Sequence, residues 1–73
     1  MIQTIEQRRN YEVEWESPST GEMRVTWFIT QKDAEEYAER KAWKYGTVAT
    51  VYKLHYTEAG QVESRELLSE YEV

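Results

Sequence analysis

The spacing of apolar residues changes twice between Ile29 and Val48, from a period of two to a helical period and back to two. A period of two is typical of a half-buried strand, and a period of about 3.6 is typical of an amphipathic helix. The stretch therefore predicts a strand, a helix and a second strand in that order. This prediction sets the architecture of the chain and leaves its activity open.

The expected helix runs from about Gln31 to Tyr45. Thr30 precedes it as the N-cap, and Asp33 occupies the third helical position as the acidic arm of a capping box. Gly46 follows as the glycine that ends a helix. Small alanines recur along one stripe of the helix, so we expect it to lie close to a sheet. The stripe contains Ala34, Tyr37, Ala38, Lys41, Ala42 and Tyr45.

Two alternating segments precede the helix, at residues 10–16 and 22–29, with a Pro- and Gly-containing turn between them. We expect them to form a hairpin in which Trp15 pairs with Met23 and Glu14 with Arg24, because this register matches apolar with apolar and acid with base. One face of the hairpin would then be apolar. It would carry Tyr11, Val13 and Trp15 with Met23, Val25 and Trp27.

A second hairpin follows the helix. Residues 47–57 are rich in β-branched and aromatic side chains, and the loop 58–60 ends in Gly60. A fourth strand runs from Gln61 to about Leu67 or Leu68, and residues 69–73 either continue it or fray. The chain of 73 residues is thus expected to be a single α+β domain of order ββαββ, a four-stranded mainly antiparallel sheet with one helix.

One helix covers one face of a sheet. The expected register places Phe28, Ala49 and Val51 on the other face. We therefore expect either a terminal segment of the chain or a partner to cover these side chains.

Composition limits the functional classes. Fourteen Asp and Glu against nine Lys and Arg give a net charge of −5, which repels nucleic acid and membranes and favours a partner with a basic surface. The chain has no cysteine, and it shows neither an apolar run of membrane-spanning length nor the basic start and apolar stretch of a signal peptide. These features predict a cytoplasmic protein without disulfides or a membrane segment.

No catalytic or metal-binding motif is recognisable. His55 is the single histidine, and the expected hairpin places Glu63 opposite it. Without a nucleophile or a second acid at motif spacing, an exposed cross-strand His–Glu pair is the favoured interpretation. No calcium-loop spacing and no phosphate-cradling glycine loop is present. We expect a protein that is not an enzyme and holds no metal or cofactor.

Trp43 is the strongest candidate for partner contact. It lies opposite Ala34 on the helical wheel, on a polar face where an exposed Trp often marks an interface. The alternative is that Trp43 folds over the helix end or under an N-terminal segment that contains Ile2 and Ile5. Phe28 is the second expected apolar anchor. The expected steering carboxylates are Glu12, Glu14, Glu36 and Glu39, of which the first two otherwise form a solvated strand face.

The segment from Ile29 to Leu54 resembles small phage-encoded ββαββ proteins, including some anti-CRISPR inhibitors. The shared features are a strand ending in Ile-Thr-Gln, an alanine-spaced helix, and the exit sequence Tyr45-Gly46-Thr47-Val48. The resemblance implies a protein that binds and occludes a host machine without catalysis, in the cytoplasm of the host cell. The acidic charge adds the hypothesis that the protein mimics nucleic acid and occupies a basic groove.

The preferred functional hypothesis is therefore a non-enzymatic protein-binding module of a phage or mobile element that inhibits a host protein. Direct binding of nucleic acid or membrane is not expected. Two alternatives stay open. One is a structural homodimer formed through the second sheet face, and the other is a module that sequesters a small ligand between sheet and helix.

Overall fold

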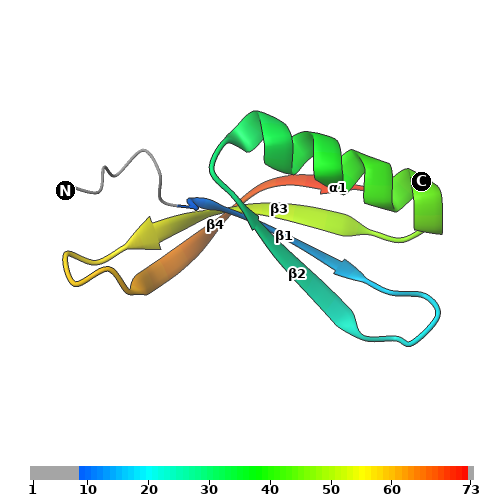
Figure 1. The fold of residues 1–73 in the computed structure, drawn as a ribbon, viewed down its shortest axis with the longest axis horizontal. Coiled ribbons are helices and arrows are strands. Elements are labelled where there is room, and N and C mark those ends of the chain that lie inside the picture. The colour runs from blue at the N-terminus through cyan, green and yellow to red at the C-terminus, as the bar shows by residue number, and fades with distance from the viewer. Residues whose placement is uncertain (1–8, 73) are drawn as a thin grey trace, which may run out of the picture.

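The computed structural model describes residues 9–72, which form four strands and one helix in the predicted ββαββ order. The strands make one antiparallel sheet of spatial order β2-β1-β3-β4, and α1 lies across one face of it (Figure 1). The α+β prediction is confirmed. The elements are β1 (Tyr11–Glu16), β2 (Met23–Phe28), α1 (Gln31–Tyr45), β3 (Ala49–Tyr56) and β4 (Val62–Tyr71).

The helix begins and ends at the residues that its sequence predicts. The Thr30 side chain accepts a hydrogen bond of 3.2 Å from the Asp33 amide, which satisfies one of the free N–H groups of the first turn. Gly46 follows the last turn with φ of 61°, a left-handed conformation that glycine adopts without strain. Both ends are therefore fixed by interactions local to the sequence.

The core lies between α1 and the sheet. Val13 and Val51 are fully buried at neighbouring positions of the two central strands. Alanines form the buried stripe of the helix, and their small side chains let the helix backbone approach the sheet closely. The buried cluster contains Val13, Trp15, Ala34, Ala38, Ala42, Ala49 and Val51, with Tyr11, Phe28, Tyr37, Leu68 and Tyr71 packed at its border.

The expected register of the first hairpin is wrong by one residue. Trp15 pairs with Arg24, not with Met23. The cause lies in the turn, where Ser17 bonds to both Gly21 (2.7 Å) and Glu22 (2.8 Å). Gly21 has φ of 75°, a left-handed conformation that glycine adopts without strain, and it lies within the loop, so that Ser17 faces Glu22. A shift of one residue turns every side chain of β2 to the opposite face.

This shift also changes the expected position of Phe28. Its ring packs against Tyr37 of α1, with 5.0 Å between the ring centroids, so Phe28 belongs to the border of the core and is not available as a free apolar anchor. Ala49 and Val51 lie on the same helix-covered face and are buried. The face that α1 leaves uncovered instead receives Met23, Val25 and Trp27 from β2.

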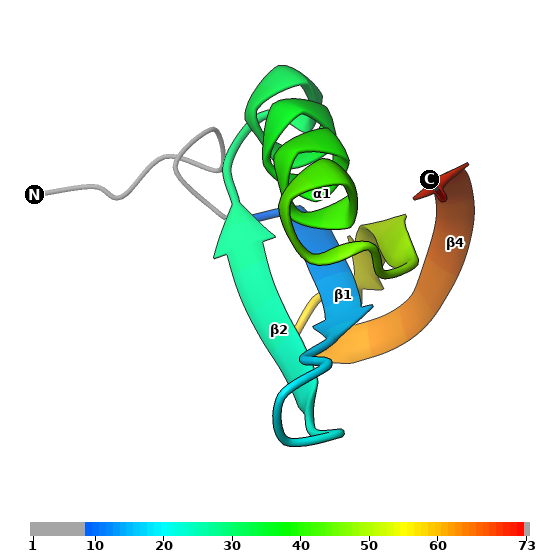
Figure 2. The ribbon, with the colours of Figure 1, turned by 90° about the vertical axis from the view of Figure 1, so that its right-hand side faces the viewer.

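Strand β4 contains two register shifts against β3, which leave Leu68 and Glu63 as extra residues. Bulges bend the strand that carries them, and β4 is strongly curved (Figure 2). Ser69 pairs with Val51 on the helix-covered side, whereas Leu67 pairs with Tyr52 on the other side. The strand continues to Tyr71, which is one of the two outcomes left open for residues 69–73.

The two hairpins extend from the central part of the sheet in different directions (Figure 1). The molecule is correspondingly elongated, with principal extents of 41 × 21 × 20 Å. Within residues 9–72, α1 is too short and too polar to cross a membrane.

Candidate functional site

The largest candidate surface is the sheet face that lies away from α1. Among the described residues no helix or strand covers it (Figures 1 and 2). One cross-strand row spans all four strands, and its outer members are exposed, Trp27 to 47% and Leu67 to 61%. We call this surface the open sheet face. It contains Glu12, Glu14, Met23, Val25, Trp27, Thr50, Tyr52, Arg65 and Leu67.

Glu12 lies at the centre of the open sheet face and is only 9% exposed. Trp27 Nε1 donates to one carboxylate oxygen over 3.1 Å, and Arg65 Nη1 donates to the other over 2.6 Å. The guanidinium of Arg65 also lies 4.2 Å from the centroid of the Tyr52 ring. The hydrogen bond with Glu12 is the main reason why the pKa of Arg65 is raised.

These contacts correct the expected role of Glu12. Its carboxylate was expected to be solvated and to steer a partner, but Trp27 and Arg65 occupy its oxygens. The reason is that β1 is an inner strand, so that neighbours on both sides cover its outward side chains. Glu14 stays partly exposed, with one oxygen 3.9 Å from Arg65 Nη1.

Trp43 lies on a second, separate surface. Its side chain is 71% exposed, and Glu36 and Glu39 are exposed at helical spacings of seven and four residues from it. We call these three residues the outer helix face. Because the helix packs on the sheet through its alanines, this face points away from the sheet. The alternative cover by Ile2 and Ile5 lies outside the described residues.

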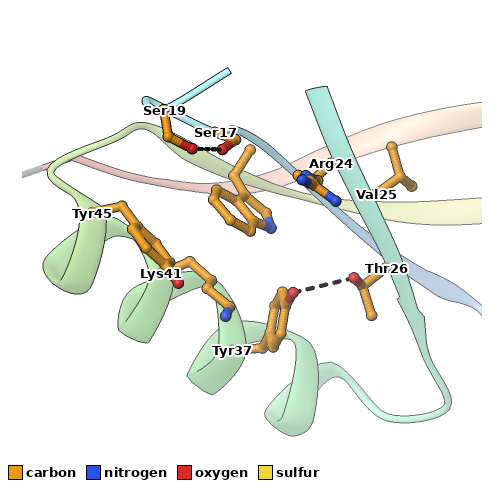
Figure 3. Close-up of a pocket in the computed structure, with 9 residues that line it drawn as sticks. Ser17, Ser19, Arg24, Val25, Thr26, Tyr37, Lys41 and Tyr45 are labelled. Atoms are coloured by element: carbon orange, nitrogen blue, oxygen red, sulfur yellow. Dashed lines mark hydrogen bonds between the residues drawn. The ribbon is translucent and has the colours of Figure 1, made fainter. Parts of the chain in front are cut away.

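A third candidate is a groove between α1 and the β1–β2 hairpin, with a volume of about 470 Å³ (Figure 3). Volumes of this size accommodate a small molecule. We call it the helix–hairpin groove. It is lined by Trp15, Ser17, Ser19, Arg24, Val25, Thr26, Tyr37, Lys41 and Tyr45.

Aromatic rings fix the position of Lys41 in the helix–hairpin groove. Trp15 and Tyr45 stack with 5.1 Å between ring centroids. Lys41 Nζ lies 5.3 Å from the Trp15 centroid, 5.2 Å from that of Tyr37 and 5.4 Å from that of Tyr45. Each distance is within the range in which a ring face attracts a cation. The ammonium group is thereby held at a defined place in the wall.

Hydrogen-bond donors dominate the remaining wall. The Tyr37 hydroxyl hydrogen-bonds to the Thr26 hydroxyl over 3.2 Å, as Figure 3 shows. Trp15 Nε1 is buried and has no hydrogen-bond partner among the described residues. Within residues 9–72, no Asp or Glu lines the groove, and neither Lys41 nor Arg24 forms an ion pair.

Sequence reasoning did not identify this groove as a site, although one local signal for it exists. Lys41 interrupts an otherwise apolar stripe, which is a local signal for a cation facing the sheet. Arg24 was missed because the expected register placed it opposite Glu14. Ser17 and Ser19 were assigned only to the turn. Their side chains hydrogen-bond to each other over 3.2 Å beside the groove.

His55 forms the exposed His–Glu pair that the sequence favours, with a different glutamate. Its Nε2 lies 2.9 Å from Glu66 Oε1, and both side chains are exposed. The bulge at Glu63 moves that residue out of register, so His55 pairs with Ser64 in the ladder. Within residues 9–72, no three His, Cys, Asp or Glu side chains are arranged to hold a metal.

Glu35 ties the helix to β4. Its carboxylate accepts hydrogen bonds from Tyr71 (2.6 Å), Ser69 (2.8 Å) and Gln31 (3.1 Å). Burial acts to raise the pKa of Glu35, but these donors together lower it below its ordinary value. The hydrogen bond to Glu35, with burial, raises the pKa of Tyr71 to about 12. These satisfied contacts identify a structural link.

Comparison with known proteins assigns no family. No family model, no curated protein and no solved structure matches the chain. The resemblance of Ile29 to Leu54 to phage-encoded inhibitors stays a prediction. Function is inferred below from the described side chains.

Proposed function

We propose that the protein is a non-enzymatic binding module that docks on a larger protein through the open sheet face. The observation that carries this proposal is the exposure of large apolar side chains there, with Met23 at 55%, Leu67 at 61% and Trp27 at 47%. These side chains lie on the two edge strands of the sheet, β2 and β4, and exposed apolar side chains of this size are typical of an interaction site. Inhibition of a host protein, as the anti-CRISPR resemblance implies, is the proposed consequence of docking.

Two of the exposed aromatic groups are already held in place. The Trp27 indole donates to Glu12, and Arg65 lies over the Tyr52 ring. Side chains that are ordered before binding lose less conformational entropy when a partner arrives. Trp, Tyr and Arg are also the residues that most often dominate binding energy at interfaces. The open sheet face therefore combines suitable residue types with a fixed geometry.

The charge of the chain favours a partner with basic groups around an apolar recess. Strand β4 bounds the open sheet face and exposes Glu63, Glu66 and Glu70 against one arginine. Complementary charge increases the rate of encounter and disfavours partners of like charge. Two copies of this chain, each with a net charge of −5, repel each other, so a foreign protein is favoured over a homodimer.

The test is affinity capture from host lysate with the tagged protein and two variants. The first variant, Trp27→Ala/Leu67→Ser, alters the open sheet face. The second, Trp43→Ala, removes an exposed Trp from the outer helix face and serves as the matched control. We expect one dominant protein to be retained by the wild type and by Trp43→Ala, and to be lost with the first variant. Retention should decrease as salt is added.

Other results would assign the function differently. Loss of the captured protein with Trp43→Ala alone would transfer the site to the outer helix face, which the 71% exposure of Trp43 makes the second candidate. Twice the monomer mass in sedimentation, abolished by Trp27→Ala/Leu67→Ser, would support the homodimer. Capture that is equal for all three proteins would contradict docking through either surface.

A further inference from the structure

We propose that the helix–hairpin groove binds a small organic anion through a carboxylate or phosphate group. The groove lies on the helix-covered side of the sheet and, among the described residues, shares only Val25 with the proposed docking surface. Among residues 9–72, its wall supplies two cationic side chains, Lys41 and Arg24, and no carboxylate. A ligand rich in hydrogen-bond acceptors is the chemical complement of such a wall.

The cations are available to a ligand. Among residues 9–72 neither Lys41 nor Arg24 has an acidic partner. Acidic residues outnumber basic residues in the chain, 14 to nine. Among the described residues, by contrast, every charged side chain that lines the groove is basic.

The aromatic wall excludes a cationic ligand. Three rings facing one space are the usual receptor for a quaternary ammonium group. Here Lys41 Nζ itself occupies that space, at 5.2 to 5.4 Å from the three ring centroids. A second cation would meet a like charge. The rings instead hold the ammonium group in one orientation. An anion that binds this ordered donor causes little further loss of conformational entropy.

Trp15 supplies a separate observation. Its Nε1 is buried and has no partner within the described part of the chain, although buried donors are nearly always satisfied. Trp15 lines the groove together with the hydroxyl groups of Ser17, Thr26 and Tyr37. Nε1 has almost no solvent-accessible surface in this structure, so an acceptor oxygen that enters the groove would complete the hydrogen bonding of this indole once a lining side chain shifts. A volume of about 470 Å³ leaves room for a small organic molecule around that oxygen.

Nuclear magnetic resonance of the indole N–H groups tests this assignment. The chain has three Trp, and each gives its own indole signal, so Trp15 can be followed beside Trp27 and Trp43. The probes are sodium pyrophosphate and sodium citrate, each compared with sodium chloride of equal ionic strength. We expect a saturable shift of the Trp15 signal with at least one probe. The probe that binds more tightly distinguishes a phosphate from a carboxylate ligand.

Matched substitutions locate the site. Lys41→Gln and Arg24→Gln should each weaken binding about tenfold or more, because each variant loses a hydrogen bond between a charged donor and the anion. Lys32→Gln makes the same change at an exposed position of the same helix and should leave binding unaltered. Arg24 is exposed in an edge strand, so Arg24→Gln tests the site even where Lys41→Gln alters the packing.

Two results would overturn the proposal. One is a Trp15 signal that does not respond to millimolar pyrophosphate or citrate beyond its response to sodium chloride. The other is equal weakening by Lys32→Gln and Lys41→Gln, which would show general charge attraction without a built site. Neither result bears on docking through the open sheet face, because the groove variants leave that surface intact.

Discussion

The two faces of the sheet bury their central side chains by different means. On the helix-covered face, Val13 and Val51 are fully buried against alanines. On the open sheet face, Glu12 is almost as well buried, but its cover consists of Trp27 and Arg65 with their hydrogen bonds. The helix-covered face is apolar at its centre, and the open sheet face is polar at its centre and apolar at its exposed ends.

This difference means that one face of the sheet mainly stabilises the fold and the other is available for binding. Full burial of a valine side chain stabilises a fold by roughly 1.5–3 kcal/mol, whereas an ion pair with an exposed partner contributes about 1 kcal/mol or less. Arg65 is 42% exposed, so the covered face carries most of the free energy of folding. Substitutions on the open sheet face are correspondingly tolerated, which leaves that surface free to serve a partner.

The largest expected effect comes from a charge placed in the covered face. Val51→Asp buries an unpaired carboxylate among alanines, at a cost that exceeds the roughly 3–5 kcal/mol available to a domain of this size. We expect the variant to be unfolded at 25 °C by circular dichroism. Leu67→Asp introduces the same group on the open sheet face and should remain folded. Similar loss of structure in both would show that the two faces contribute equally.

A smaller effect is expected at the link between α1 and β4. Tyr71→Phe removes a donor from the Glu35 carboxylate and should lower the free energy of unfolding by about 1–2 kcal/mol in urea titrations. The pKa of Tyr71 is raised from its ordinary 10.0 to about 12, so its contribution is complete below pH 10.0 and is lost as the pH rises towards 12. The variant should lack this alkaline decrease. A wild type of constant stability across that range would contradict the link.

A loss of about 1 kcal/mol is expected on the open sheet face with Arg65→Met. The methionine keeps part of the contact with Tyr52, but Glu12 retains only the Trp27 donor. Glu12→Gln/Arg65→Met should be less destabilised than the sum of the single variants, since the two residues share one interaction. Strict additivity in urea titrations would mean that the pair contributes no coupling.

The smallest effect is expected at the outer helix face. Trp43→Ala removes a ring that is 71% exposed and should change the free energy of unfolding by less than about 0.5 kcal/mol. Trp15→Ala, which removes the stacked and buried Trp, is the matched comparison and should cost about 3–5 kcal/mol. A large thermal destabilisation by Trp43→Ala would show that further parts of the chain cover this ring.

Local features made the helix predictable. Thr30, Asp33 and Gly46 act within the segment they delimit, and the alanine stripe follows from spacing alone. The register of the first hairpin depends on Gly21, whose left-handed conformation adds one residue to the turn. The alternating pattern correctly predicts that β2 is a strand, but the predicted register places the side chains of β2 on the wrong faces of the sheet. This single shift moved Phe28 into the core border and brought Arg24 to the groove.

The contacts of the open sheet face had no local signal. Arg65 lies 53 residues from Glu12 in the chain, and their meeting requires all four strands to be in register. The same holds for Glu35 and Tyr71, which come together only because β4 curves back over the helix side. Lys41 is the exception, since a cation in an apolar stripe is visible in the sequence.

The extra residue at Leu68 divides β4 into two segments of opposite phase. Arg65 and Leu67 face outward, whereas Ser69 and Tyr71, also at odd positions, face the helix. Odd positions therefore face away from the helix before the extra residue and towards the helix after it. A substitution in β4 changes only the face on which its side chain lies. Deletion of Leu68 would merge the two phases and turn Tyr71 away from Glu35, so this strand tolerates exchange of residues far better than a change in their number.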